Sequence, residues 1–276
     1  MLLITGATGN TGSALVEQCD RHHIKYSVAS SRKLEGYRHL DFNKPETFSE
    51  ALSGITTVFL VRPPAMANID KQFKPFIEYL SSTDVKNIIF LSILGAEKRS
   101  FVPHRKIEKL IEQSNLNYAF LRASFFMQNL TTTHQVELEQ ENKLYLPAGN
   151  GKTSFVDVED IAKAVVSILK RPSTKAAYDL TGSEALDYYE VAETLSKALG
   201  RPITYESVSP LSFFLRWLKN TRSFMQALVM TVIYTVARSG NAARISDDLK
   251  HLLKDDPTTM KEFAHRFAHE DKSLTA

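Results

Sequence analysis

Three glycines near the start of the chain have a spacing that suits the binding of a phosphate group. Gly6 permits a tight turn, Gly9 removes a Cβ where a pyrophosphate must approach the backbone, and Gly12 lets the next helix lie close to the strand. The N-terminus of that helix offers N–H groups and a partial positive charge. We therefore expect residues 6–12 to bind a dinucleotide, although a plain glycine-rich turn is an alternative. The segment is Thr5-Gly6-Ala7-Thr8-Gly9-Asn10-Thr11-Gly12.

The end of the second expected strand indicates which dinucleotide binds. NAD-binding folds place an Asp or Glu about 20 residues after the glycines, where it holds the ribose 2′-hydroxyl. This chain has Ser31, Arg32 and Lys33 there, and no acid. Two cations suit a 2′-phosphate, because the planar guanidinium of an arginine can donate two parallel hydrogen bonds to it. The segment therefore predicts NADP(H) rather than NAD(H). A solvated basic turn is the alternative, and it would leave the preference undefined.

A second candidate contact for the nucleotide precedes the next expected helix. Asp41 and Phe42 lie there, and together they are a candidate contact for the adenine ring. Asp41 is also a residue type that begins turns without any ligand. Both interpretations of Asp41 stay open at this point.

The elements that would position these residues alternate between apolar strands and helices. Strands are expected at 2–4, 26–29, 57–61, 87–92 and 118–122, and helices at 13–21, 45–52, 69–81 and 106–113. Such alternation predicts a parallel sheet with helices on both faces. The fold class is therefore α/β, a Rossmann-like doubly wound sheet, with a smaller helix-rich C-terminal lobe that holds the substrate.

The second half of the chain changes character. Helices are expected at 159–170 and 188–199, strands at 178–181 and 203–208, and a helix-rich remainder at 211–267. We expect a nucleotide-binding domain over residues 1–130, to which 155–183 return. The smaller lobe comprises 131–154 and 184–276, and a ligand would bind between its cap and the carboxyl edge of the sheet.

Composition excludes several classes of protein. Hydrophobic residues make up 43% and charged residues 24% of the 276 positions, as in an ordinary globular protein. The formal net charge of +3 is spread along the chain, and the densest basic run, 99–109, is short, so no nucleic-acid partner is expected. The single cysteine, Cys19, excludes an internal disulfide and favours a reducing, cytoplasmic location.

The longest apolar stretch covers residues 224–237. It is shorter than the roughly 20 residues that a membrane-spanning helix needs, and it contains Gln226, Thr231 and Thr235. We expect a buried or interface helix there and no membrane span. Attachment to a membrane surface is a less favoured alternative.

Six segments taken together resemble the NmrA-like group of atypical short-chain dehydrogenases/reductases. They are the glycine loop, Phe90-Leu-Ser-Ile-Leu-Gly-Ala96, His104-Arg-Lys-Ile-Glu108, Leu121-Arg-Ala-Ser-Phe-Phe-Met-Gln-Asn129, Phe155-Val-Asp-Val-Glu-Asp-Ile-Ala162 and Tyr178-Asp-Leu-Thr-Gly182. The group includes NAD(P)H-sensing regulators, type-2 quinone oxidoreductases and reductases similar to agroclavine dehydrogenase. The resemblance implies that Val61, Arg62, Pro63, Ser92 and Ile93 line the cofactor.

One departure from the wider superfamily concerns the catalytic residues. Many members use a Tyr-x-x-x-Lys pair, but this chain has no tyrosine between Ser92 and Glu108. His104 stands where the resemblance places the lysine, as in the quinone-reductase branch. Near neutral pH it could donate a hydrogen bond or a proton to a reduced oxygen. Alternatively it is a surface residue at the start of a helix, after Pro103.

Four residues are candidate contacts for the acceptor. Phe125 and Phe126 could form an apolar wall for a flat molecule, or simply belong to the core, and Asn129 could fix the loop or the substrate. Tyr145 is a weaker candidate. The acids Asp157, Glu159 and Asp160 stand where a helix begins and suit its dipole, so no metal is expected.

The leading hypothesis is an NADPH-dependent oxidoreductase that transfers hydride to a quinone or another flat electrophile. The first alternative is a regulator that senses NAD(P)H without turnover and binds a protein partner. The second is an imine or ene reductase similar to agroclavine dehydrogenase. Quinones and iminium ions accept hydride readily, so the missing Tyr-Lys pair weighs less against them than against alcohol dehydrogenation. A small-molecule electron acceptor is expected as partner, and a homodimer stays open.

Overall fold

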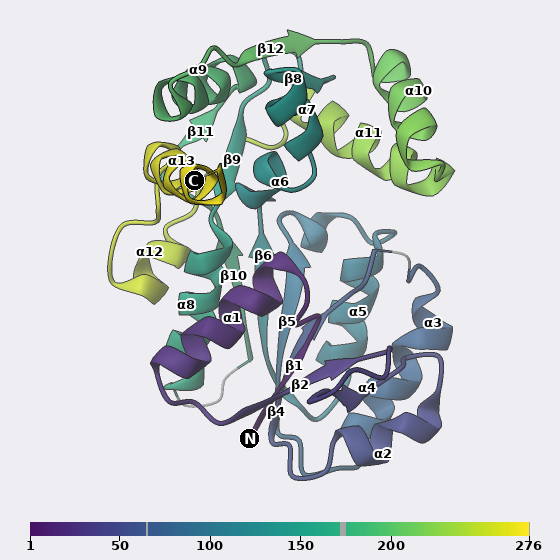
Figure 1. Cartoon of the computed structure of the whole chain (residues 1–276). Helices are drawn as coiled ribbons and strands as arrows, with labels where there is room; N and C mark the ends of the chain where they lie inside the picture. The colour runs from purple at the N-terminus through teal and green to yellow at the C-terminus, as the bar shows by residue number, and fades with distance from the viewer. Residues whose placement is uncertain (65, 172–174, 276) are drawn as a thin grey trace. The chain divides into compact units, whose positions relative to one another are not determined.

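A parallel sheet is the centre of the first part of the chain (Figure 1). The computed structural model describes residues 1–64, 66–171 and 175–275, with side chains to residue 269, and within these ranges the sheet has seven strands. All neighbouring pairs are parallel. In spatial order the strands are β10 (Lys175–Leu180), β6 (Asn117–Ala123), β5 (Asn87–Ile93), β4 (Thr57–Val61), β1 (Leu2–Thr5), β2 (Tyr26–Ser30) and β3 (Arg38–His39).

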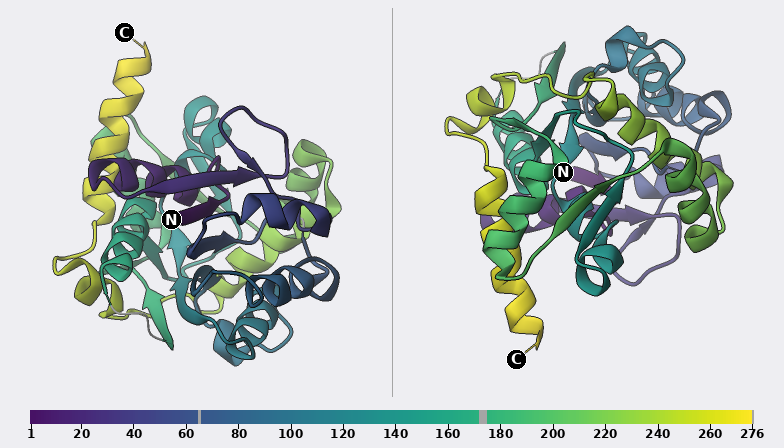
Figure 2. Two further views of the ribbon diagram at one scale, coloured as in Figure 1. Left: turned by 90° about the horizontal axis from the view of Figure 1, so that it is seen from below. Right: turned by 90° about the horizontal axis from the view of Figure 1, so that it is seen from above.

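Helices cover both faces of this sheet, as the views in Figures 1 and 2 show. One face carries α1 (Asn10–Arg21) and α8 (Val158–Leu169), which pack together, and α12 (Asp248–Leu253) packs on α8. The other face carries η1 (Pro45–Thr47), α2 (Phe48–Ala51), α3 (Ile69–Gln72), α4 (Lys74–Leu80) and α5 (Pro103–Glu112). The short helix η2 (Ala96–Lys98) follows β5. The predicted doubly wound, Rossmann-like fold is confirmed, and its strand order reverses between β1 and β4, where such sheets bind ligands.

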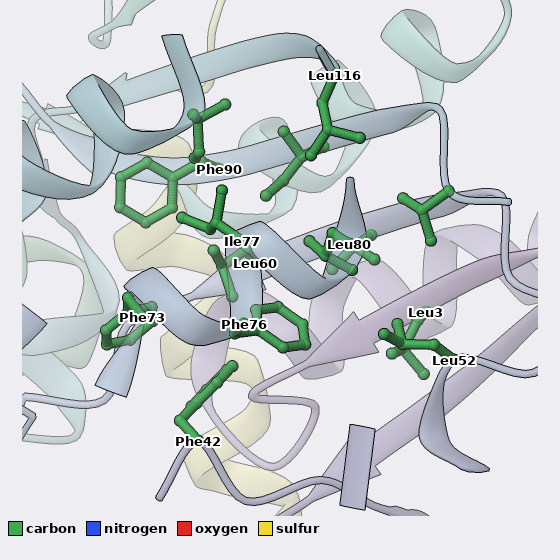
Figure 3. Close-up of a cluster of buried hydrophobic side chains, with 14 of the residues drawn as sticks. Leu3, Phe42, Leu52, Leu60, Phe73, Phe76, Ile77, Leu80, Phe90 and Leu116 are labelled. Carbon is green, nitrogen blue, oxygen red and sulfur yellow. The ribbon is translucent and has the colours of Figure 1, made fainter. Parts of the chain in front are cut away.

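The core between the sheet and the second helical layer is rich in phenylalanine (Figure 3). Alternate residues of the strands, such as Leu3, Leu60 and Phe90, are fully buried and face Phe76 and Leu80 of α4. This period of two is what a strand with one face on this layer requires. The packing fixes where β1, β4 and β5 end, and therefore where their carboxyl-edge residues lie.

Prolines account for two of the places where the helices differ from the sequence prediction in their bounds. The expected helix 69–81 is divided at Phe73 into α3 and α4, because Pro75 has no N–H and suits only the first turn of a helix. For the same reason α5 begins at Pro103 instead of residue 106. The earlier start places His104 in the first turn of α5.

A second compact unit contains shorter sheets and most of the later helices. Its strands are β7 (Phe125–Phe126), β8 (Lys143–Leu146), β9 (Thr153–Val156), β11 (Ala185–Leu186) and β12 (Thr204–Ser207). They pair in the orders β11-β9-β7 and β12-β8. Its helices are α6 (Gln128–Thr131), α7 (Gln135–Gln140), α9 (Tyr188–Leu199), α10 (Pro210–Thr221), α11 (Phe224–Arg238) and α13 (Met260–Thr275). The predicted bounds of α9 are the observed ones, since Asp187 and Glu190 form a capping box and Gly200 ends the helix.

The two units divide the chain at several points. The first unit comprises Met1–Ala123, Val158–Leu180 and Asp248–Asp255, and the second Ser124–Asp157, Thr181–Asp247 and Asp256–Ala276. The domains expected from the sequence instead placed 124–130, 155–157 and 181–183 with the nucleotide-binding part, and 248–255 with the smaller lobe. Across the part of the chain that is described, no helix combines the length and the apolar character needed to cross a membrane.

Candidate functional site

The glycine loop joins β1 to α1 in a conformation that depends on two of its glycines. Gly6 has a φ of +68°, which a residue with a Cβ rarely adopts. Its carbonyl oxygen accepts a hydrogen bond of 3.0 Å from the N–H of Gly9. A Cβ on Gly12 would lie 2.1 Å from that same oxygen, which is an impossible contact. The protein itself therefore requires glycine at both positions.

Gly9 is different because the folded chain does not require it. Its φ of −99° and ψ of 167° are open to any residue. A Cβ there would come no closer than 3.5 Å to a described atom outside the neighbouring residues, an ordinary contact with the oxygen of Gly6. Gly9 is also the N-cap of α1. This cap residue offers no side chain to accept a hydrogen bond from the N–H groups at this end of the helix, and the first turn contains no acid. An anion can therefore approach this end of α1 without steric or electrostatic opposition from the first turn.

The turn after β2 presents two exposed cations. The side chains of Arg32 and Lys33 are exposed and form no ion pair within the part of the chain that is described. The hydroxyl of Ser30 accepts a 3.0 Å hydrogen bond from the N–H of Arg32, and this fixes the turn. Ser31 is also exposed, and its carbonyl oxygen lies 3.2 Å from Nε2 of His39. The residues predicted to hold a 2′-phosphate thus share one solvent-facing turn.

Asp41 and Phe42 follow β3 and have different surroundings. The Asp41 carboxylate accepts a 2.9 Å hydrogen bond from the N–H of Asn43, so Asp41 does begin a turn. The Phe42 ring is buried and stacks on Phe73 with centroids 4.8 Å apart. It also meets Phe76 edge to face at 5.0 Å. Phe42 therefore belongs to the core shown in Figure 3.

The carboxyl end of β4 carries a partly buried guanidinium. Nη1 of Arg62 donates to the carbonyl oxygens of Pro63, Pro64 and Met66, at 3.1, 3.1 and 2.7 Å. These bonds shape the loop after β4, while Val61 packs against Gly6. Among the described residues, no carboxylate pairs with Arg62, and its buried Nε has no hydrogen-bond partner. Burial lowers the pKa of Arg62, but a guanidinium still carries its charge at neutral pH.

His104 lies beside this arginine, on the first turn of α5. Its ring stacks on that of Phe90, with centroids 6.0 Å apart, so it is not a freely exposed residue at a helix start. Burial, and then the charge of Arg62, lower the pKa of His104 from 6.5 to about 3, although Glu108 opposes the shift. The imidazole is therefore neutral near pH 7. Of the two predicted roles, donation of a hydrogen bond fits this pKa and donation of a proton at neutral pH does not.

A buried carboxylate ties the ends of β5 and β6 to α5. Glu108 accepts hydrogen bonds from Ser92 Oγ at 2.8 Å and from Arg105 at 2.9 Å, and two from Arg122 at 3.0 Å. Burial alone would raise the pKa of Glu108, but these bonds outweigh it and the pKa is lowered. Ser92 is buried and thus serves this network, while Ile93 beside it is only partly buried. The spacing of four between His104 and Glu108 drew attention to this carboxylate, but no local pattern indicated Ser92 and Arg122 as its partners.

The predicted acceptor residues belong to the second unit. Phe125 packs edge to face on Phe155 at 5.7 Å and contacts Tyr234, so it contributes to that unit's core. Phe126 and Asn129 are partly buried, and the guanidinium of Arg216 covers the ring of Tyr145 at 4.4 Å. No group of acids, histidines or cysteines within the described ranges is arranged to hold a metal ion.

Sequence reasoning missed a buried polar network in the second unit. His134 Nδ1 lies 2.7 Å from the Glu137 carboxylate, and its Nε2 contacts the hydroxyl of Tyr234. All three side chains are buried, and Trp217 packs on the histidine ring. The 100 residues between His134 and Tyr234 left no local pattern from which the pair could be found. The network holds α11 against the segment before α7.

Comparison with known proteins decides the family. The NmrA-like family profile matches residues 1–264, which is most of the chain.

The chain belongs to the NmrA-like family. The resemblance predicted from six sequence segments is thereby confirmed.

Relatives of this NmrA-like chain include enzymes. An NAD(P)H azoreductase from Xenophilus azovorans is 28% identical over 290 residues, covering 97% of this chain and 98% of that protein. An agroclavine dehydrogenase from Claviceps purpurea is 27% identical over 264 residues, covering 90% and 91%. The solved NADPH-dependent quinone oxidoreductase QOR2 of Escherichia coli, complexed with NADPH, matches with a TM-score of 0.83, 23% identity and coverage of 97% and 99%. The last likeness is one of fold.

The two roles of glycine in the loop predict opposite results for two alanine substitutions. Gly12→Ala should lower the free energy of unfolding by about 3 kcal/mol or more, because its Cβ would overlap a backbone oxygen. Gly9→Ala should change it by less than about 1 kcal/mol but weaken dinucleotide binding at least about tenfold. Urea unfolding and calorimetric titration measure the two effects. A Gly9→Ala protein that binds as tightly as the parent would contradict this assignment.

The lowered pKa of His104 predicts a pH dependence of stability. Below about pH 6.5 the imidazole of His104 is protonated in the unfolded chain, whereas in the folded chain it stays neutral until about pH 3. Folding should therefore lose up to about 1.4 kcal/mol per pH unit as the pH falls through this window. His104→Asn should flatten that part of the curve. His22→Asn, at an exposed histidine, is the matched control and should leave the loss in place.

Proposed function

We propose that the chain is an NADPH-dependent oxidoreductase that transfers hydride to a quinone-like or other flat electrophilic acceptor. The observation that carries the proposal is Gly9, whose missing side chain the folded protein does not need. A ligand that must come close to the backbone explains the glycine. Its position at the uncapped N-terminus of α1, at the carboxyl edge of a doubly wound sheet, suits a diphosphate.

The choice of NADPH rests on the turn after β2. Arg32 and Lys33 are exposed and pair with no acid among the residues that the structure describes, so their charges are available to a 2′-phosphate. A carboxylate, which would hold the 2′-hydroxyl of NADH, does not stand in this turn. The proposal assigns the diphosphate to residues 6–12, the 2′-phosphate to this turn, and the nicotinamide to the ends of β4 and β5.

The chemistry that NADPH would supply is a hydride, and the protein supplies position and charge. Arg62 offers a fixed positive charge at the end of β4, and no carboxylate within the described ranges neutralises it. The neutral His104 beside it can donate an N–H to an oxygen that becomes negative as the acceptor is reduced. Glu108 holds α5, and with it His104, against β5 and β6. The neutral imidazole of His104 thus suits stabilisation of an oxyanion through a hydrogen bond, and it is not a general acid at pH 7.

That electrostatic character favours acceptors that need little acid catalysis. A quinone oxygen becomes a stable phenolate, and an iminium ion takes hydride and becomes neutral. An ordinary ketone yields a strongly basic alkoxide and needs a proton at once. The Tyr-Lys pair that would supply it is absent between residues 92 and 108. We therefore rank a quinone first and an imine, as in the agroclavine dehydrogenase relative, second, with Phe125, Phe126, Asn129 and Tyr145 as proposed acceptor contacts.

A regulator that binds NAD(P)H without turnover is the second candidate. The pKa of about 3 at His104 favours it, because this imidazole does not act as a general acid at neutral pH. In either case a cytoplasmic location is proposed from the composition. The lone Cys19 is buried, and its pKa is raised to about 11 by burial and by Asp20, so its thiol is unreactive.

The assignment of the basic turn predicts a selective loss. Replacing Arg32 and Lys33 together by alanine should weaken NADPH binding about 100-fold, because two charge-assisted contacts to the 2′-phosphate are lost. NADH binding should change less than about threefold. Fluorescence titration with both coenzymes measures this. Lys25→Ala, at the opposite end of β2, is the matched control; equal losses for both coenzymes would refute the assignment.

The proposed activity predicts NADPH consumption that depends on an acceptor. Benzoquinones and naphthoquinones, with a cyclic iminium salt and a ketone beside them, are mixed with protein and NADPH while absorbance of the coenzyme is followed. We expect turnover with a quinone and none with the ketone. Gly9→Ala should lower turnover at subsaturating NADPH at least about tenfold, in step with the weaker binding. Tight NADPH binding without loss of NADPH for any acceptor would instead support the regulator.

A further inference from the structure

Helix α11 is apolar on nearly every side. Ala227, Tyr234 and Ala237 form its buried side and pack in the core of the second unit. A helix that is hydrophobic all round is normally covered all round. The opposite side of α11 is nevertheless exposed, and it carries Phe224, Met225, Leu228, Val229, Val232 and Ile233.

The neighbouring helix α10 extends this apolar surface. Figure 1 shows α10 and α11 side by side, joined by a short turn. Phe214 of α10 meets Phe224 of α11 edge to face at 5.4 Å. Leu211 and Leu215 of α10 are 66% and 55% exposed, and Phe224 and Met225 are each 61% exposed. We call these four residues, with the exposed side of α11, the α10–α11 surface. Apolar side chains grouped in this way mark an interaction site.

The stretch of chain that forms the α10–α11 surface carries charges of one sign. Residues 207–246 contain five basic residues and no Asp or Glu. Arg216 is engaged within the unit by Glu141 and Glu137. Lys219 and Arg222 are exposed beside Phe224 at the turn, and within the described ranges neither forms an ion pair. The turn between α10 and α11 therefore combines these two cations with the aromatic ring of Phe224 and the side chain of Met225.

This combination of positive charge and apolar side chains discriminates between two occupants, a second copy of the chain and an anionic lipid bilayer. In a two-fold contact between copies, Lys219 and Arg222 would meet the same two cations of the other copy, and the stretch 207–246 contains no acid to balance them. An anionic bilayer offers both an apolar interior and negative headgroups. We propose that the α10–α11 surface docks onto anionic lipid bilayers, with Phe224 and Met225 between the headgroups and Lys219 and Arg222 on their phosphates. The proposal stands apart from the proposed function.

Contacts with the rest of the second unit hold α10 and α11 in place for binding to a bilayer. The Tyr234 hydroxyl of α11 binds His134, and Trp217 of α10 packs on the same histidine. Arg216 donates to Glu141 at 2.6 Å. Both helices are thus anchored from behind by polar contacts, so the exposed apolar side chains are presented without the helices having to unfold or rotate.

Sedimentation with vesicles tests the proposal. The whole chain is mixed with phosphatidylcholine vesicles, with or without phosphatidylglycerol, at low and high salt. We expect binding to the anionic vesicles that weakens with salt. Lys219→Gln with Arg222→Asn should weaken it about thirtyfold, since each cation near the surface contributes about fivefold. Asparagine suits Arg222, whose φ is +53°. Phe224→Ser with Met225→Ser should weaken it more than about tenfold.

Matched controls and an independent measurement keep the outcomes distinct. Lys86→Gln and Phe101→Ser change an exposed cation and an exposed aromatic in the first unit and should bind as the parent does. Circular dichroism checks that each variant is folded, and the charge variant leaves the apolar residues untouched. Absence of vesicle binding, or equal binding by the variants, overturns the proposal. So does self-association that Phe224→Ser with Met225→Ser abolishes, since the surface would then join two copies.

Discussion

The close approach of Gly12 to the carbonyl oxygen of Gly6 is the contact on which the proposed nucleotide site depends. A Cβ at residue 12 would lie 2.1 Å from that oxygen, so only glycine lets α1 begin this near to the end of β1. That approach brings the N–H groups of the first turn to the carboxyl edge of the sheet. The hydroxyl of Thr5 ties the same edge to β4, since it donates to Phe59 and accepts from the N–H of Val61. The phosphate end and the β4 end of the site are therefore fixed to each other.

A second constraint is the burial of charge at the ends of β4, β5 and β6. Glu108 is fully buried and stays ionised because Ser92, Arg105 and Arg122 all donate to it. In the part of the chain that the structure describes, Arg62 has only carbonyl oxygens as partners, so no carboxylate there neutralises its charge, and it helps to keep His104 neutral. Arg122 is thus paired with a buried carboxylate, whereas the charge of Arg62 is available to an incoming group. This difference is the electrostatic basis of the proposal that the region binds an acceptor whose oxygen becomes negative.

The sequence predicts those features that short segments determine. The strand 57–61 and the helix 188–199 are predicted with their observed bounds, because an apolar run and a capping signal are local. The glycine loop and the family are predicted for the same reason. The strands β7, β9 and β11 pair residues far apart in sequence and carry no local pattern. The pairing of Glu108 with Arg122, the contact of His134 with Tyr234 and the pKa of His104 also depend on which groups folding brings together. Residues 224–237 are correctly expected to form a helix, but how much of it is exposed follows only from its packing.

Binding of the coenzyme itself tests the account most directly. Calorimetric titration of the whole chain with NADPH, and separately with NADH, measures whether the glycine loop and the basic turn hold a dinucleotide. The account predicts saturable binding with one NADPH per chain and weaker binding of NADH. No measurable heat with either coenzyme, at concentrations far above those of ordinary dehydrogenases, would contradict it.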